Sequence, residues 1–331
     1  MFYDNDCNVN FIKNKIITVI GYGSQGHAHA LNLKDSNIET FICLKEESKS
    51  INKAKNAGFK ILKIEDAVNV SDILVILIPD EEQKSLYYNY IENKFKKGKT
   101  LIFAHGFNIH FKQIIPKNQF NIILVAPKAP GHTVRSTFQE KNGVPALIAV
   151  YQDYDKNSLN IALAYAKCIG SSRVGLILTT FKDETETDLF GEQSVLCGGV
   201  SSLIICGFET LVEAGYSPEL AYFECLHELK LIVDLIYEGG LQDMRYSISN
   251  TAEFGDYLIS ENYYYIVFKK KMKKILNNIQ NGEFAKNFLL DKSVNFLKLN
   301  SFRTKYQNHL IEHVGKKIRS MFSWNYKKII H

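Results

Sequence analysis

Short apolar runs rich in β-branched residues alternate with helix-like stretches over the first half of the chain. They are the segments Ile16 to Ile20, Thr40 to Leu44, Ile73 to Ile78, Leu101 to Ala104, Ile122 to Ala126 and Ala146 to Val150. Continuous apolar strands separated by helices are typical of a parallel sheet that is covered on both faces. A helix over Ser158 to Ile169 and a strand over Arg173 to Leu178 would complete this doubly wound α/β domain, which we place at residues 1–180.

The pattern changes after Thr180, where strand-like runs give way to long apolar stretches interrupted by glycine. One helix has clear limits, because Ser217 suits an N-cap, Pro218 suits the first helical position and Gly239-Gly240 follows the run. We therefore predict an all-helical second domain over residues 181–326.

Composition narrows the functional classes. Forty Lys and Arg residues against 35 Asp and Glu leave a charge of +5, spread along 331 residues. A nucleic-acid-binding surface is usually more concentrated, so we expect no nucleic-acid partner. The N-terminus lacks the basic and apolar regions of a signal peptide, and no apolar run approaches membrane-spanning length. These features predict a cytoplasmic protein with small-molecule ligands and no membrane partner.

A glycine-rich segment, Gly21-Tyr22-Gly23-Ser24-Gln25-Gly26, directly follows the first predicted strand and opens a predicted helix. Its first two glycines would permit a tight turn and the approach of a pyrophosphate, and the third would allow close helix packing. The helix N-terminus would supply donors and positive potential. The segment predicts a Rossmann-type dinucleotide site; the alternative is a glycine-rich connection without a ligand.

The segment after the second predicted strand indicates which dinucleotide is bound. An acidic residue there would accept hydrogen bonds from the ribose 2′-hydroxyl of NAD. Here Lys45 offers a cation, and Ser48 and Ser50 offer hydroxyls, which match the charge and oxygens of a 2′-phosphate. We predict NADPH, although Glu46 and Glu47 in the same loop point the other way unless they face solvent.

Two pairs of acids recur at helical spacing in the second half, Asp188 with Glu192 and Glu224 with Glu228. Residues four apart share one face of a helix. The plain explanation is a solvated face with surface ion pairs. However, unpaired carboxylates on a helix this apolar would be costly to bury, whereas divalent cations would offset their charge. An all-oxygen set favours a hard ion, so we predict Mg²⁺, and four acids could bridge two ions.

From the first strand to Trp324 the sequence resembles the short form of the ketol-acid reductoisomerases, also called acetohydroxy-acid isomeroreductases. The resemblance rests on both acidic helices and on these segments: Gly21 to Asn32, Leu44 to Ser50, Ile78 to Asp80, Ala104 to Phe107, Ala126 to His132, Tyr246 to Gly255 and Glu312 to Arg319. It implies a Rossmann-type domain followed by an all-α domain that is knotted or interlaced with its partner.

The resemblance also implies the site residues. Asp188, Glu192, Glu224 and Glu228 would hold two Mg²⁺ ions, and Ser249 would contact the substrate carboxylate. His105 and Lys128 match positions that follow two strands at the carboxyl edge of the sheet. The nucleotide would lie over Tyr22, Gly23, Ser24, Gln25, Lys45, Ser48, Ser50, Asp80, Glu81, Glu82, Gln83 and Gly131. In the short form Glu224, Glu228 and Ser249 would come from a neighbouring subunit, which implies a homo-oligomer with shared active sites.

The implied reaction is a 1,2-alkyl shift in 2-acetolactate or 2-aceto-2-hydroxybutyrate, followed by reduction with NADPH to the 2,3-dihydroxy acid, in branched-chain amino acid synthesis. We take His105, Lys128 and Glu228 as candidate catalytic residues. Glu228 is the candidate for proton handling as well as metal binding, and His105 or a water relay is its rival. Lys45 departs from the usual Arg, and Asn250 and Phe254 stand where Asp and Tyr are common.

Two other functions fit parts of the pattern. A Rossmann β-hydroxyacid-type dehydrogenase with a helical second domain would need no metal, and the acidic pairs argue against it. A non-catalytic NADP-binding protein would not need the four acids and Ser249 together. Magnesium dependence and turnover would separate these alternatives.

Overall fold

The structure is a computed structural model that describes residues 1–260 and 263–322. It divides into two compact units, Met1–Thr185 and the chain from Glu186 onward. The end of the predicted second domain, residues 323–326, lies outside the described residues.

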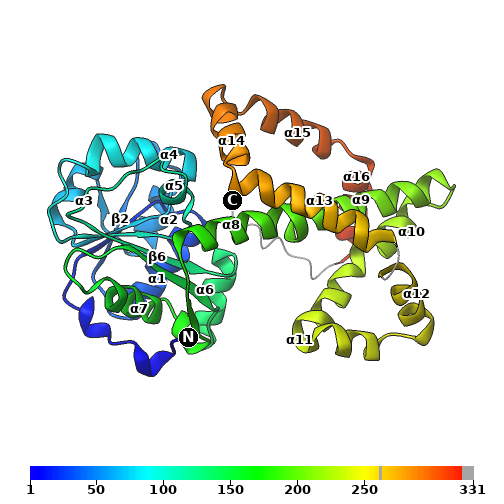
Figure 1. The fold of residues 1–331 in the computed structure, drawn as a ribbon, viewed down its shortest axis with the longest axis horizontal. Coiled ribbons are helices and arrows are strands. Elements are labelled where there is room, and N and C mark those ends of the chain that lie inside the picture. Colours follow the sequence, from blue (N-terminus) through cyan, green and yellow to red (C-terminus); the bar gives the residue numbers. More distant parts are fainter. Residues whose placement is uncertain (261–262, 323–331) are drawn as a thin grey trace. The chain divides into compact units, whose positions relative to one another are not determined.

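The first unit contains an eight-stranded sheet in the order β3-β2-β1-β4-β5-β6-β7-β8. Figure 1 draws its strands as arrows. The strands are β1 Ile17–Ile20, β2 Thr40–Cys43, β3 Ile61–Leu62, β4 Ile73–Ile76, β5 Thr100–Phe103, β6 Asn121–Pro127, β7 Ala146–Gln152 and β8 Leu176–Leu178. The order reverses at β1, so the chain crosses to the other half of the sheet between β3 and β4. A crevice at the carboxyl ends of strands next to such a switch point is where doubly wound sheets bind ligands.

Helices cover both faces of this sheet. They are α1 Ser24–Asp35, α2 Ile51–Asn56, α3 Ile64–Val70, α4 Asp80–Leu86, α5 Phe107–His110, α6 Gly131–Gln139 and α7 Ser158–Cys168, with short 3-10 turns at Asp4–Asp6, Val9–Phe11 and Ser171–Arg173 and a π-helical segment at Tyr87–Ile91. Successive residues of a strand pack into different hydrophobic clusters, one on each face of the sheet. Val19 packs in the cluster that includes α1 and α7, and Ile20 packs in the cluster that includes α3 and α5.

The strands predicted from the sequence are present, with two corrections. The predicted parallel sheet is mixed, because β7 pairs antiparallel with β6, so that Ala146 stands opposite Pro127. The chain leaves β6 and enters β7 at the same edge of the sheet, and no crossover is made. The sequence also missed β3, whose two residues, Ile61 and Leu62, are too few to show a strand period.

All described elements after β8 are helical, as predicted. They are α8 Phe181–Gly191, α9 Gly198–Glu213, α10 Pro218–Tyr222, α11 Leu229–Ser247, α12 Asn250–Ser260, α13 Tyr263–Gln280, α14 Glu283–Ser293, α15 Leu297–Gln307 and α16 Leu310–Met321, with π-helical segments η5 Glu192–Leu196 and η6 Phe223–His227. Helix α8 begins in the first unit and ends in the second.

The helix predicted to follow Ser217 begins as expected, and its regular helical backbone stops at Gly239-Gly240, also as predicted. The Ser217 hydroxyl accepts a hydrogen bond from the Leu220 amide and caps α10. Helix α11 runs past both glycines to Ser247, with a kink at Gly240, where φ is 76° and ψ is −177°. Glycine adopts this backbone without a Cβ clash, so the glycine pair ends the first helical stretch, and a second stretch continues to Ser247.

Candidate active site

The glycine loop between β1 and α1 has the backbone that a dinucleotide site needs. Gly21 takes a positive φ of 101°, and a Cβ on it would lie 2.5 Å from the Leu77 carbonyl oxygen. A Cβ on Gly26 would lie 2.3 Å from the Gly21 oxygen. Gly23 differs, because its Cβ would meet nothing within 4 Å. Space therefore remains open at Gly23, beside the N-terminus of α1, where an anion would be favoured.

The loop is tied to the segment after β6. The Gln25 side-chain amide donates to the Ala129 carbonyl over 2.9 Å. A Cβ on Gly131 would lie 2.2 Å from the Ser24 carbonyl oxygen, so the N-termini of α1 and α6 are in close contact. The Tyr22 ring is buried against His27 and Phe59, and burial raises the pKa of its hydroxyl to about 12. Tyr22 therefore offers a ligand its backbone more readily than its ring.

The segment after β2 places Lys45 next to an acid from α4. Lys45 Nζ lies 2.6 Å from Glu82 Oε2. Within the segment, the Ser48 amide donates to the Lys45 carbonyl, and the Ser50 amide donates to the Ser48 hydroxyl oxygen. Ser50 is the N-cap residue of α2. The predicted 2′-phosphate ligands thus lie in one compact turn, and the cation among them is already paired.

Helix α4 follows β4 and carries the other predicted nucleotide contacts, Asp80, Glu81, Glu82 and Gln83. The buried Gln83 amide donates to the Ile78 carbonyl and to Asp80 Oδ1, and its oxygen accepts from Asn108. Asn108 also donates to the Asp80 carbonyl. Gln83 therefore shapes the loop around the start of α4, and its neighbours Glu81 and Glu82 are half-buried.

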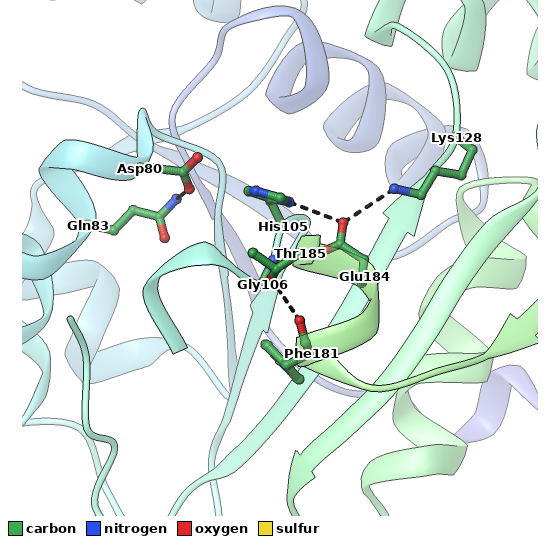
Figure 2. Close-up of polar contacts among 8 residues, drawn as sticks. All are labelled: Asp80, Gln83, His105, Gly106, Lys128, Phe181, Glu184 and Thr185. Atoms are coloured by element: carbon green, nitrogen blue, oxygen red, sulfur yellow. Dashed lines mark hydrogen bonds and ion pairs between the residues drawn. The ribbon is translucent and has the colours of Figure 1, made fainter. Parts of the chain in front are cut away.

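A buried carboxylate, Glu184, joins the two predicted catalytic residues of the sheet edge. His105 follows β5 and Lys128 follows β6. Glu184 Oε1 lies 3.2 Å from His105 Nδ1 and 3.3 Å from Lys128 Nζ, as Figure 2 shows. Its Oε2 accepts a hydrogen bond of 2.8 Å from the Gly106 amide. The side chain of Glu184 is 1% exposed, whereas His105 and Lys128 are 20% and 32% exposed.

The charge state of Glu184 follows from these partners. Burial opposes its ionisation, but the His105 hydrogen bond and charge, the Lys128 ammonium group and the Gly106 amide outweigh burial, so the pKa of Glu184 lies below its ordinary value. An ionised carboxylate only accepts hydrogen bonds. His105 Nδ1 must therefore carry a proton, which makes Nε2 the basic nitrogen of the neutral ring.

Gly106 permits this contact between α8 and the loop after β5. A Cβ at Gly106 would lie 2.4 Å from Thr185 Oγ1 and 2.7 Å from the Phe181 carbonyl oxygen. The Thr185 hydroxyl donates to the Phe181 carbonyl over 2.7 Å, which fixes the first turn of α8 (Figure 2). The absence of a side chain at residue 106 thus allows Glu184 to reach His105.

The first predicted metal pair begins on α8, and the geometry of the helix changes at its second acid, Glu192. Asp188 lies one turn after Glu184, and ligand-capable oxygens of these two residues lie within 4.8 Å of each other. Helix α8 ends at Gly191, and Glu192 opens the π-helical segment η5, in which the Cys197 amide donates to the Glu192 carbonyl. Glu192 is exposed and Asp188 is half-buried.

The second predicted pair contains another π-helical turn. Glu224 lies in η6, whose hydrogen bond runs from the Glu228 amide to the Phe223 carbonyl. Both carboxylates are exposed. Ser249 directly precedes α12, and its hydroxyl accepts a hydrogen bond from the Ala252 amide. A π-helical turn therefore begins at the second acid of the first pair, and another spans the second pair; such turns are frequent at functional sites.

The residues fit both groups that the sequence predicts. The four acids offer only carboxylate oxygens, which are ligands suited to a hard divalent ion. The open space beside Gly23 and the positively polarised end of α1 suit a pyrophosphate.

Sequence reasoning missed Glu184. A signal was present, because Glu184 stands four residues before Asp188 and extends the same row of acids along the helix. The spacing does not show, however, that the side chain is buried between His105 and Lys128. That information arises only from the contact of α8 with the sheet edge.

Comparisons with known proteins assign both halves of the chain to one family. Residues 11–175 match the family model described as acetohydroxy acid isomeroreductase, NADPH-binding domain. Residues 181–324 match the model described as ketol-acid reductoisomerase, C-terminal domain. A curated relative from Psychrobacter arcticus, ketol-acid reductoisomerase (NADP(+)), is 53% identical over 324 residues, which cover 98% of this chain and 96% of the relative.

Solved structures agree with this assignment. The structure of an NADH-preferring ketol-acid reductoisomerase from an uncultured archean is 44% identical, with a TM-score of 0.93 and coverage of 97% of this chain and 99% of that one. A semialdehyde dehydrogenase NAD-binding protein from Cupriavidus necator is 16% identical with a TM-score of 0.58, covering 81% of this chain and 99% of that one. At this identity the second similarity shows the fold alone.

Proposed function

The chain belongs to the ketol-acid reductoisomerase family, and from this we propose that it converts 2-acetolactate or 2-aceto-2-hydroxybutyrate into the corresponding 2,3-dihydroxy acid. The observation that carries the proposal is the buried Glu184, which joins His105 and Lys128 one helical turn before Asp188. A dehydrogenase that only moves a hydride has no need for a row of acids beside its base. The two alternatives, a β-hydroxyacid-type dehydrogenase and a non-catalytic NADP-binding protein, are not favoured.

The cofactor in this proposal is NADPH, which supplies the hydride. Its pyrophosphate would lie against the backbone of Tyr22 to Gln25 and the N-terminus of α1, and Gly131 keeps the neighbouring helix close. Lys45, Ser48 and Ser50 would bind the 2′-phosphate. Asp80 to Gln83 would line the opposite side of the adenosine half.

We propose that Asp188, Glu192, Glu224 and Glu228 hold two Mg²⁺ ions. Bound Mg²⁺ would polarise the substrate carbonyl and favour ionisation of the neighbouring hydroxyl. The four acids together would set the substrate's orientation, and Ser249 would bind its carboxylate. Ser249 can turn from its helix-capping bond with little loss, because an N-cap hydrogen bond contributes only about 1 kcal/mol.

The alkyl shift requires one proton to move between oxygens, and the reduction that follows takes a hydride from NADPH onto C-2 and a second proton, from solvent, onto the C-2 oxygen. In 2-acetolactate the methyl group at C-2 migrates to C-3, the C-2 hydroxyl becomes a carbonyl and loses its proton, and the C-3 oxygen gains one. Glu228 is one candidate for this transfer. His105 is the other, because ionised Glu184 keeps the proton on Nδ1 and makes Nε2 the accepting nitrogen. Lys128 supplies a positive charge beside the same carboxylate.

A variant separates these two candidates. Glu228→Gln keeps the size of the side chain and removes its basicity. If Glu228 moves the proton, the variant should retain Mg²⁺ and NADPH binding while its turnover falls. Wild-type rates in a variant that binds both would exclude Glu228 and leave His105 or a water relay.

We further propose that the helical unit is covered by a second copy of the chain, interlaced with it, which would supply Glu224, Glu228 and Ser249 to its neighbour. By length and composition alone, one helical stretch in the described part, Phe181–Glu213, could cross a membrane, but its N-terminal half carries the row of acids. Only 6% of the most apolar 18 residues of this stretch are buried. Leu196 on this stretch and Tyr237 on α11 are 70% and 90% exposed, which suits a protein partner. We propose a cytoplasmic homo-oligomer.

The direct test of the function is NADPH oxidation by the purified chain with racemic 2-acetolactate, with and without Mg²⁺. We expect oxidation that needs Mg²⁺ and yields 2,3-dihydroxyisovalerate. Oxidation that is independent of Mg²⁺ would favour the dehydrogenase. NADPH binding without any turnover of either substrate would favour the non-catalytic protein.

A further inference from the structure

An ion pair links the two segments that flank the glycine loop. Lys45 lies two residues after the end of β2, and Glu82 lies in the first turn of α4, which follows β4. Their charged atoms, Nζ and Oε2, are 2.6 Å apart. In the sheet, β1 lies between β2 and β4, and the glycine loop follows β1. The pair therefore bridges the mouth of the nucleotide crevice.

This position corresponds to the adenosine half of a dinucleotide. In doubly wound folds the residue at the end of β2 reaches the adenosine ribose, where an acid accepts the 2′-hydroxyl of NADH and a cation binds the 2′-phosphate of NADPH. Here the strand end supplies the cation, and the acid comes from α4. The cation that suits NADPH and the acid that suits NADH are thus both present, and they form an ion pair with each other.

From this geometry we propose that Glu82 is a specificity-determining residue, and that its ion pair with Lys45 lets the chain use both NADPH and NADH. The proposal rests on the nucleotide-binding part of the proposed function. When NADPH binds, Lys45 turns from Glu82 to the 2′-phosphate, and the Glu82 carboxylate remains near a second anion, which weakens binding. When NADH binds, the ion pair persists and Glu82 accepts the 2′-hydroxyl.

The exposure of the pair permits this exchange. The side chains of Lys45 and Glu82 are 79% and 34% exposed. Exposed ion pairs contribute little to stability, so Lys45 can leave its partner at small cost. The repulsion between Glu82 and a 2′-phosphate is also partly screened, which limits the expected discrimination to modest factors.

A second ion pair on the same segment provides a matched control. Glu46 lies next to Lys45, and its Oε1 is 2.6 Å from Nζ of Lys63, the N-cap residue of α3. Lys63 directly follows β3, on the far side of β2 from the glycine loop. Glu46→Gln thus removes the same charge as Glu82→Gln and also breaks an ion pair to a lysine, but away from the adenosine site.

The experiment measures binding by calorimetry for wild type, Glu82→Gln and Glu46→Gln. The probes are NADPH, NADH, adenosine 2′,5′-bisphosphate and adenosine 5′-monophosphate. We expect wild type to bind NADPH and NADH within about tenfold of each other. Glu82→Gln should tighten the binding of NADPH and of the bisphosphate about fivefold without tightening the binding of NADH. Added salt should reduce this increase in affinity, because it screens the charges. Glu46→Gln should change each affinity by less than about twofold.

A further variant guards against a folding defect in Glu82→Gln. Lys45→Gln should weaken NADPH binding about tenfold and leave NADH binding unchanged, because it removes the cation that binds the 2′-phosphate. This variant tests the same ion pair through its other residue. Equal changes in NADPH affinity in Glu82→Gln and Glu46→Gln would show that only the overall charge of this region matters, and would overturn the proposal. Unchanged or weaker NADPH binding in Glu82→Gln would also overturn it.

The outcome is independent of the reaction, because all readouts are binding constants. If the affinities shift as expected but 2-acetolactate is not converted, the proposed function fails and the role of Glu82 stands. If 2-acetolactate is converted with Mg²⁺ but the affinities do not shift, the reverse holds.

Discussion

Single residues decide the chemistry at the sheet edge, and Glu184 is the clearest case. It is buried, ionised and bonded to three partners, of which two are cationic or can become so. Replacing it with Gln removes the charge and leaves Lys128 beside an amide. We expect turnover to fall at least tenfold and the free energy of unfolding to fall by about 1.5–3 kcal/mol, the range for a hydrogen bond to a charged group. Kinetics and denaturant unfolding would measure both effects.

The contribution of Glu184 to stability should depend on pH in a defined direction. Its pKa is lowered on folding from the ordinary value of 4.5, so its stabilising effect is fully present above that value. The effect is lost as pH falls through the lower pKa of the folded state. The difference in unfolding free energy between wild type and Glu184→Gln should therefore shrink below about pH 4.5. A difference that grew with acid would contradict the assigned ionisation.

The glycine loop gives a pair of substitutions with opposite outcomes. A Cβ at residue 23 meets no protein atom, whereas a Cβ at residue 26 would lie 2.3 Å from the Gly21 oxygen. Gly23→Ala should keep wild-type thermal stability and bind NADPH at least tenfold more weakly, since the methyl group would occupy the space of the pyrophosphate. Gly26→Ala should lose stability. Equal NADPH affinity in wild type and Gly23→Ala would place the cofactor elsewhere.

The sequence revealed the types of these residues but not all of their contacts. The glycine spacing predicted an open backbone at Gly23, which the structure shows. The burial of Glu184 and the pairing of Lys45 with Glu82 were not predicted, because both depend on side chains that are distant in sequence. Local patterns carry no information about such partners.

At the scale of elements, periodicity identified the strands and helices but neither their directions nor their irregularities. Apolar runs look the same in parallel and antiparallel strands, so the direction of β7 could not be read from the sequence. The π-helical turns at Glu192 and Glu224 were also missed, since one wider turn barely alters a helical pattern. These turns matter because the predicted metal ligands Glu192 and Glu224 lie in them.

The π-helical turn η5 depends on small residues that follow it. A Cβ on Gly198 would lie 2.3 Å from the Gln193 carbonyl oxygen, so the chain could not keep this turn with alanine there. We expect Gly198→Ala to shift Glu192 and weaken Mg²⁺ binding about tenfold, in the range for residues that orient metal ligands. NADPH affinity should not change, because its predicted site lies in the first unit. Calorimetry with each ligand separately would test this, and unchanged Mg²⁺ affinity would show that the turn is not needed.

At the scale of the whole molecule, the helical unit exposes more apolar surface than a solitary domain usually does. Leu196, Leu203, Leu231 and Tyr246 are each more than half exposed. We expect light scattering to give at least twice the mass of one chain at micromolar concentration. Leu203→Asp should lower that mass, whereas Lys298→Asp on α15 should not, since it replaces an already exposed charged residue. A monomeric wild type would contradict shared active sites.

The central claim is that this chain moves an alkyl group before it reduces the product, and one labelled carbon tests it. The substrate is 2-acetolactate with ¹³C in the methyl group on C-2, incubated with Mg²⁺ and NADPH, and the product is analysed by NMR. We predict 2,3-dihydroxy-3-methylbutanoate, with the label in a methyl group on C-3. If the label remained on C-2, in 2,3-dihydroxy-2-methylbutanoate, the chain would be a simple reductase and the role assigned to the acids would be wrong.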